Sequence, residues 1–198
     1  GLLPGSRPPE AERNFVLQMR LVEKATRRAA AHPTRLAFRA ALVPRLMEVL
    51  PRLAAEEGWS LDGSLLHKGD GPNRAEIGVP GNAFADILDA SSFVVAMAGQ
   101  ASDQALALGK PSFMFAGDGP QFSWRFAEAQ NRLHGGLSRL IGTGPADDAL
   151  LETAAKELVA AAQDEAWLVR AREEGPRRMG SRGSAQRFVD AIRRAMDL

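Results

Sequence analysis

"SFVVAMAGQASDQALALGKPSFMFA" (residues 92–116) places two apolar runs on either side of a small, polar segment. Residues 92–97 and 112–116 are rich in β-branched and aromatic side chains without polar alternation. This composition is typical of strands buried on both faces of a parallel sheet. Between them a helix is expected, because Gly109 suits a helix C-terminus and Pro111 cannot continue one. The stretch therefore predicts a strand–helix–strand unit.

The rest of the chain alternates in the same way. Stretches with apolar residues every three or four positions, typical of amphipathic helices, separate short strand-like runs at 1–3, 35–43, 64–68, 75–79 and 138–142. This pattern predicts one α/β domain over residues 1–198, a three-layer sandwich with a Rossmann-like parallel sheet and helices on both faces. The stripes also predict which apolar residues face inward: Ala105 and Leu108, then Phe126 and Leu133, and in the last helix, beginning at Ser184, Phe188, Ile192 and Met196.

Composition excludes several classes of protein. The 198 residues are 45% hydrophobic and 25% charged, as in ordinary globular domains, and no apolar run approaches the ~20 residues of a membrane span. The absence of Cys excludes disulfides and thiolate metal sites. With 25 basic and 24 acidic side chains, the chain lacks the field that attracts nucleic acid. We expect a cytoplasmic protein that does not bind nucleic acid.

Positive charge gathers near the C-terminus. Residues 170–198 hold eight Arg and four acidic residues. Such a segment most often forms the solvated face of a helix. Peripheral attachment to an anionic membrane or to an acidic partner is the alternative interpretation.

The beginning of the sequence suggests a piece of a longer protein. The chain lacks an initiating Met, and Gly1-Leu2-Leu3 resembles the end of a strand that runs into Pro4 and Gly5. We therefore expect further protein upstream of Gly1.

Two loops have the composition of an anion site. In residues 2–10, Gly5 allows a close backbone approach, Ser6 offers a hydroxyl and Arg7 can bind phosphate through two N–H groups. Because ligands bind at the carboxyl ends of parallel strands, this loop is well placed for a ligand.

The second loop lies in the opening stretch. Gly99 and Ala101 leave little bulk over the first helical turn, Gln100 lies between them and Ser102 adds a hydroxyl donor. Free N–H groups and the positive end of a helix dipole favour a diphosphate there. Each loop alone also suits a plain structural turn; together they predict phosphate binding.

These motifs carry a family resemblance. "LLPGSRPPEAERN" (2–14) resembles the opening of the C-terminal domain of lipid-A-disaccharide synthase and related GT-B glycosyltransferases. "GQASDQALALGKP" (99–111) is similar to a Gly-rich motif that these enzymes share with bacterial UDP-N-acetylglucosamine 2-epimerases. Residues 116–133 and 177–188 are similar to a lipid-A-disaccharide-synthase-related subgroup.

The resemblance implies the UDP-sugar-binding half of an inverting glycosyltransferase of lipid biosynthesis, a hexosyltransferase. A missing N-terminal domain would bind the acceptor, for which a lipid is one candidate, and bring the general base, so the isolated chain would be inactive. The UDP-sugar is then the substrate, with no cofactor and no metal. No catalytic residue is expected within the chain; Arg7, the Ser6 hydroxyl and the N–H groups of residues 100–102 would stabilise the leaving diphosphate.

Further candidates follow from the same resemblance. Gln104 stands where the family has an acidic residue that bonds the ribose, and Asp103 precedes it; Gln100 replaces a Thr. Gln121 either reaches the ribose or sugar or caps its helix. Phe84 lies where the superfamily encloses the uracil, with a place in the core as the alternative.

Glu10 is interpreted as an acid that compensates the dipole of the first helix. Two other functions stay open for the chain. One is an isomerase domain like the UDP-N-acetylglucosamine 2-epimerases, for which paired carboxylates would be expected where Asp103-Gln104 stands. The other is a non-catalytic module that has lost its ligand.

Overall fold

Four parallel strands form one half of the sheet in the computed structural model, which describes residues 1–33, 35–180 and 183–196. Each strand pairs in parallel with the next, and β7 is buried along its whole length. Their order is β1-β6-β7-β8, with bounds Leu2–Leu3 (β1), Val94–Ala96 (β6), Ser112–Ala116 (β7) and Arg139–Pro145 (β8). The predicted strands 92–97 and 112–116 are thereby confirmed as β6 and β7.

The other half combines a parallel pair with an antiparallel hairpin. Its order is β2-β5-β4-β3, with bounds Phe38–Arg39 (β2), Ala75–Gly78 (β5), Leu65–Lys68 (β4) and Ser60–Asp62 (β3). β2 and β5 are parallel, whereas β4 is antiparallel to both of its neighbours, β5 and β3. The strand predicted over 35–43 is thus much shorter than expected.

A parallel bridge between Leu2 and Ala40 joins the two halves, and the Ala41 N–H donates to the Leu2 carbonyl at 3.0 Å. The parallel strands then follow the order β5-β2-β1-β6-β7-β8, which is that of the Rossmann fold. From β1 the chain proceeds to β2 and β5 on one side, and then returns to β6 on the other. The strand order therefore reverses between β1 and β6.

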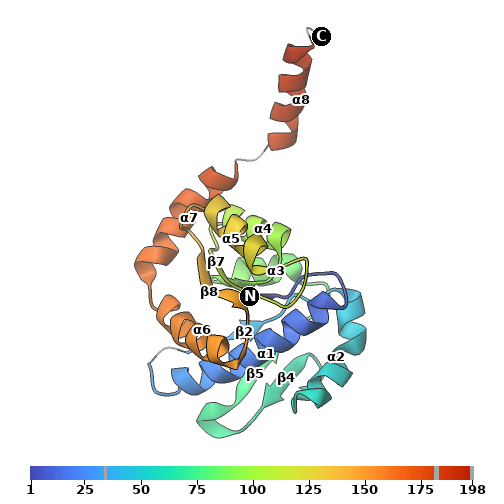
Figure 1. Ribbon diagram of the computed structural model, residues 1–198, viewed down its shortest axis with the longest axis vertical. Helices are drawn as coiled ribbons and strands as arrows, with labels where there is room; N and C mark the ends of the chain where they lie inside the picture. Colours follow the sequence, from blue (N-terminus) through green and yellow to red (C-terminus); the bar gives the residue numbers. More distant parts are fainter. Residues whose placement is uncertain (34, 181–182, 197–198) are drawn as a thin grey trace.

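Helices cover both faces of the sheet, as predicted. α1 (Glu10–Ala29) packs against α2 (Pro44–Glu56) and α6 (Asp148–Ala161), whereas α4 (Gly99–Ala107) packs against α7 (Glu165–Met179). α5 (Trp124–Leu133) packs on β7 and β8. In Figure 1, α4, α5 and α7 lie together on one side of β7 and β8, and α1 and α6 lie on the other. The shorter elements are α3 (Phe84–Ala90) and the 3₁₀ turn η1 (Gly71–Asn73).

Two predicted helix faces differ from those in the structure. Leu108 and Leu133 are exposed by 55% and 53%, and Phe126 is exposed by 44%. In α4, Ala105 is buried as predicted, together with Leu106, whereas Leu108 lies at the C-cap, beyond the last residue of the helix. α5 buries a polar residue, Gln130, which an apolar stripe cannot reveal.

The last helix, α8 (Ser184–Ala195), was also predicted wrongly to bury its apolar residues. Phe188, Ile192 and Met196 are all exposed, and Figure 1 shows α8 extending away from the sheet and its covering helices. The N-cap position of this helix is occupied by Gly183. Residues 181–182 of the quoted 177–188 motif lie outside the described part of the chain.

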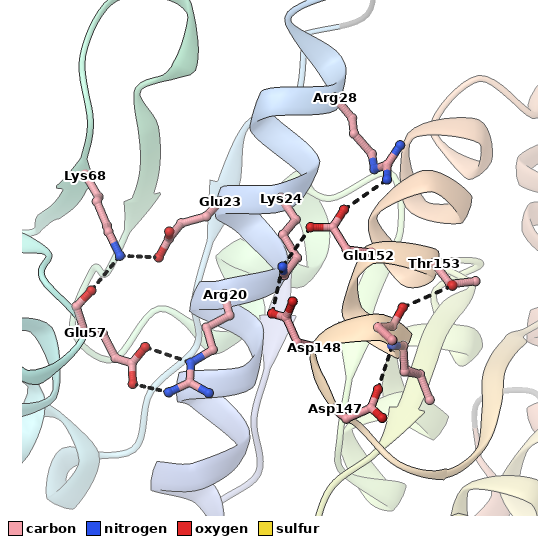
Figure 2. Close-up of polar contacts among 12 residues, drawn as sticks. Arg20, Glu23, Lys24, Arg28, Glu57, Lys68, Asp147, Asp148, Glu152 and Thr153 are labelled. Atoms are coloured by element: carbon pink, nitrogen blue, oxygen red, sulfur yellow. Dashed lines mark hydrogen bonds and ion pairs between the residues drawn. The ribbon is translucent and has the colours of Figure 1, made fainter.

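Charged contacts tie α1 to the elements on either side of it (Figure 2). Towards α2 and β4, Arg20 pairs with Glu57 at 2.7 Å, and Glu23 pairs with Lys68 at 2.8 Å. Towards α6, the buried Lys24 binds both Asp148 and Glu152 at 2.8 Å, and Arg28 also binds Glu152. Burial of Lys24 opposes its charge, yet its bonds to Asp148 and Glu152 raise its pKa.

We expect Lys24→Met to lower the free energy of unfolding by about 1 kcal/mol, as for other ion pairs that water partly reaches. Met keeps the apolar stem of the side chain, but Asp148 and Glu152 lose the cation that they share. Because their side chains are 81% and 42% exposed, water compensates for part of the lost ion pairing. Urea denaturation measures the change. Lys156→Met, on the exposed side of α6, is the matched control and should stay within about 0.5 kcal/mol. Equal effects of the two substitutions would contradict the role of Lys24.

Candidate functional site

A pocket of about 430 Å³ lies at the carboxyl ends of β1 and β6, within the usual size of small-molecule sites. Both loops singled out in the sequence line it: Gly5, Ser6 and Arg7 after β1, and residues 98–101 after β6. The pocket thus occupies the point where the strand order reverses, which is where open α/β sheets bind ligands.

The loop after β1 presents a cation, the side chain of Arg7, to the pocket. Gly5 has a φ of +101°, which favours glycine, and turns the chain so that Ser6 and Arg7 are exposed at the pocket. No hydrogen bond or ion pair of the Arg7 side chain is found within the described residues. Its guanidinium is therefore available for an anion.

The loop after β6 leads directly into α4. Ala98, at the N-cap, provides no side-chain cap, and the first backbone bond there is from the Ser102 N–H to the Ala98 carbonyl at 3.3 Å. The N–H groups of Gly99, Gln100 and Ala101 accordingly lack a partner within the helix, as in the first turn of any α-helix. They add donors and a positive helix end to the pocket that contains Arg7.

Close packing explains the glycine at the start of α4. A Cβ on Gly99 would lie 2.9 Å from two ring atoms of Phe126. The Phe126 ring, 44% exposed, also lines the pocket and lies 5.8 Å from the Phe122 ring. The Phe126 side chain of α5 thus forms an aromatic side of the pocket next to the first turn of α4.

Two predicted site residues lie outside this pocket. Ser102 is fully buried, and its hydroxyl donates to the Gly99 carbonyl at 2.7 Å. The Asp103 carboxylate accepts a bond from Gln130 and lies 3.0 Å from Nε2 of His134. Both side chains are thus engaged within the protein.

The remaining predicted residues are brought together. Gln104, Gln121 and Phe84 line the same pocket as Arg7. Gln121 does not cap α5, because the hydroxyl of Ser123 accepts the N–H of Phe126 there. Phe84 is 38% exposed, so it does not belong to the core.

Further pocket residues were not identified from the sequence. Phe126 comes from α5, and Glu10 and Asn14 come from α1, where both side chains are buried. Glu10 and Asn14 are four residues apart and so share a helix face directly after Arg7. That spacing was the one feature of the sequence that could have indicated that both residues belong to the site.

A buried polar network supports α4 and α5 from within. His134, 0% exposed, lies with Nδ1 2.6 Å from the Ser138 hydroxyl and Nε2 3.0 Å from the Asp103 carboxylate. Burial lowers the pKa of His134, although its bond to Asp103 opposes this. The three side chains resemble a Ser–His–Asp arrangement, but Ser138 is buried and accepts the Ser112 N–H, so no substrate reaches it. The network is structural.

Within the described residues, no group of three or more His, Asp or Glu side chains is arranged to hold a metal ion. None of the helices described is both long and apolar enough to cross a membrane.

Comparison with protein-family models, with curated proteins and with solved structures finds no significant match.

Proposed function

We propose that the chain is the donor-binding half of an inverting glycosyltransferase and that its pocket takes the diphosphate of a UDP-sugar. One observation carries the proposal: the unpaired Arg7 and the first turn of α4 open into the same pocket at the reversal of strand order. A guanidinium and several free N–H groups are the donors that a diphosphate requires.

The chemistry follows from where charge develops. An acceptor hydroxyl attacks the anomeric carbon, the bond from that carbon to the diphosphate oxygen breaks, and negative charge grows on UDP. Arg7 and the N–H groups of Gln100 and Ala101 stabilise this charge as the bond breaks. The acceptor and the base that takes its proton are assigned to a second domain.

Neutral groups complete the donor site in this proposal. Gln104 bonds a ribose hydroxyl, without the added strength of a carboxylate, and Phe84 packs on the uracil. Gln121 faces the sugar side. Polar but uncharged side chains such as these suit the uridine and sugar parts of the ligand, because its only charges are those of its diphosphate.

Titration calorimetry with UDP, UDP-N-acetylglucosamine and ADP tests the proposal. We expect the uridine nucleotides to bind more tightly than ADP, and Arg7→Ala to weaken them at least about tenfold, since bonds to charged groups contribute about 1.5–3 kcal/mol. Arg27→Ala, at the far end of α1, removes the same charge and should leave the affinity unchanged.

Absence of binding heat at millimolar nucleotide would overturn the proposal and favour the module that has lost its ligand. Equal affinity for UDP and ADP would retain a phosphate site but contradict the choice of a uridine sugar.

A further inference from the structure

The carboxylate of Glu10 is almost completely buried and bonds to the backbone of a distant loop. It is 3% exposed and accepts the Gln121 N–H at 3.0 and 3.1 Å and the Phe122 N–H at 2.7 Å. These residues end the loop formed by residues 117–122, which follows β7. Glu10 thus has a specific partner in addition to the dipole of its own helix.

Two helix ends favour this buried charge. Glu10 is the first residue of α1, and the loop residues that it binds directly precede the Ser123 cap of α5. Both helices begin at this point, so their positive ends and two N–H groups face one carboxylate. Hydrogen bonds to an ionised acceptor are about twice as strong as neutral ones.

The loop fits α1 because it carries glycines where it touches the helix. A Cβ on Gly119 would come within 3.0 Å of three side-chain atoms of Glu10. A Cβ on Gly117 would likewise overlap the side-chain oxygen of Asn14, which has no hydrogen-bond partner within the described residues. The Gly117 N–H donates to the Phe122 carbonyl at 3.2 Å and closes the loop.

We infer that Glu10 is a positioning residue that holds the 117–122 loop against α1 and thereby sets Gln121 in the pocket. This inference rests on the proposed function for its consequence in binding. Glu10 lies three residues after Arg7, so one short segment of chain supplies the cation of the pocket and also fixes the loop that carries Gln121. Arg7 and Gln121 are then placed as one unit.

Amide hydrogen exchange of the full chain tests the contact without any ligand. In Glu10→Gln, which keeps the shape but loses the charge, the N–H groups of Gln121 and Phe122 should exchange about tenfold faster or more. Glu12→Gln is the matched control, because Glu12 pairs with Arg52 on α2. Gly119→Ala disturbs the contact from the loop side and should speed the same two amides.

The inference is overturned if these two amides exchange at the wild-type rate in both Glu10→Gln and Gly119→Ala. This outcome does not depend on nucleotide binding, so it is distinguishable from failure of the proposed function, which would appear as absence of calorimetric heat for the wild-type chain.

A double-mutant cycle tests the action through Gln121. We expect Glu10→Gln to weaken UDP-N-acetylglucosamine about fivefold, a change of about 1 kcal/mol, and to have no further effect in the Gln121→Ala background. If the fold-losses in affinity of the two single variants instead multiply in the double variant, Glu10 acts on the ligand by another route and the positioning role is overturned. General loss of structure would not give this pattern.

Discussion

Gly175→Val is expected to lower the free energy of unfolding by about 3 kcal/mol, at the upper end of what overpacking costs. Gly175 is the buried point at which α7 crosses α4. A Cβ there would lie 2.5 Å from the carbonyl oxygen of Leu106 and 2.9 Å from its Cδ1. Because the nearest atom is helix backbone, the contact is relieved only by moving α4 or α7. Valine gains less than about 1 kcal/mol of helix propensity over glycine, too little to offset this.

Urea denaturation of Gly175→Val and of Gly144→Val measures the effect. Gly144, in β8, has no atom within 4 Å of the position of a Cβ, so the control should stay within about 0.5 kcal/mol of wild type. The crossing has a second close point, where a Cβ on Gly109 would lie 2.8 Å from the Cα of Arg172. Wild-type stability of Gly175→Val would mean that α7 does not cross α4 at this distance.

This crossing also shows why α7 was missed in the sequence. Its large buried residues, Trp167 and Leu168, are confined to the first turn, and the buried positions that follow are Ala171 and Gly175, small residues that allow a close approach but do not extend an apolar stripe. By contrast, β6 and β7 were predictable because strands buried on both faces are apolar throughout. The strand predicted over 35–43 is longer than the observed strand, which comprises only Phe38 and Arg39. The following residue, Ala40, is fully buried although it lies outside the strand.

Local sequence alone predicted the loops of the candidate site, whereas Phe84, Gln104 and Gln121, which also line the pocket, were suggested together with the family resemblance. Gly5, Arg7 and Gly99 lie in loops that directly follow strands, so the rule of ligand binding at carboxyl ends was sufficient to bring them together. Ser102 was predicted to take part in the site but does not line the pocket, because its hydroxyl bonds to the backbone of its own helix. Glu10 reaches Gln121 across 111 residues, and a single sequence contains no signal for a contact of that kind.

The second large effect is expected at His134, whose ring bonds Ser138 and Asp103 inside the protein. His134→Ala should lower the free energy of unfolding by about 3 kcal/mol at pH 7.5, since it removes a buried ring and leaves polar partners unsatisfied. Leu137→Ala, also buried and close by in the chain, is the matched control without a titrating group.

The effect at His134 should depend on pH in a defined direction. Burial lowers the pKa of His134 from 6.5; Asp103 opposes this shift and Arg178 adds to it. The unfolded chain therefore binds a proton below pH 6.5 that the folded chain binds less readily, so the stability that His134 contributes is complete above pH 6.5 and falls as the pH drops below it. Unfolding measured between pH 7.5 and 5 should show the penalty of His134→Ala shrinking, while that of Leu137→Ala stays constant. A His134→Ala penalty that grows with acidity would instead mean that folding favours the imidazolium, held by Asp103.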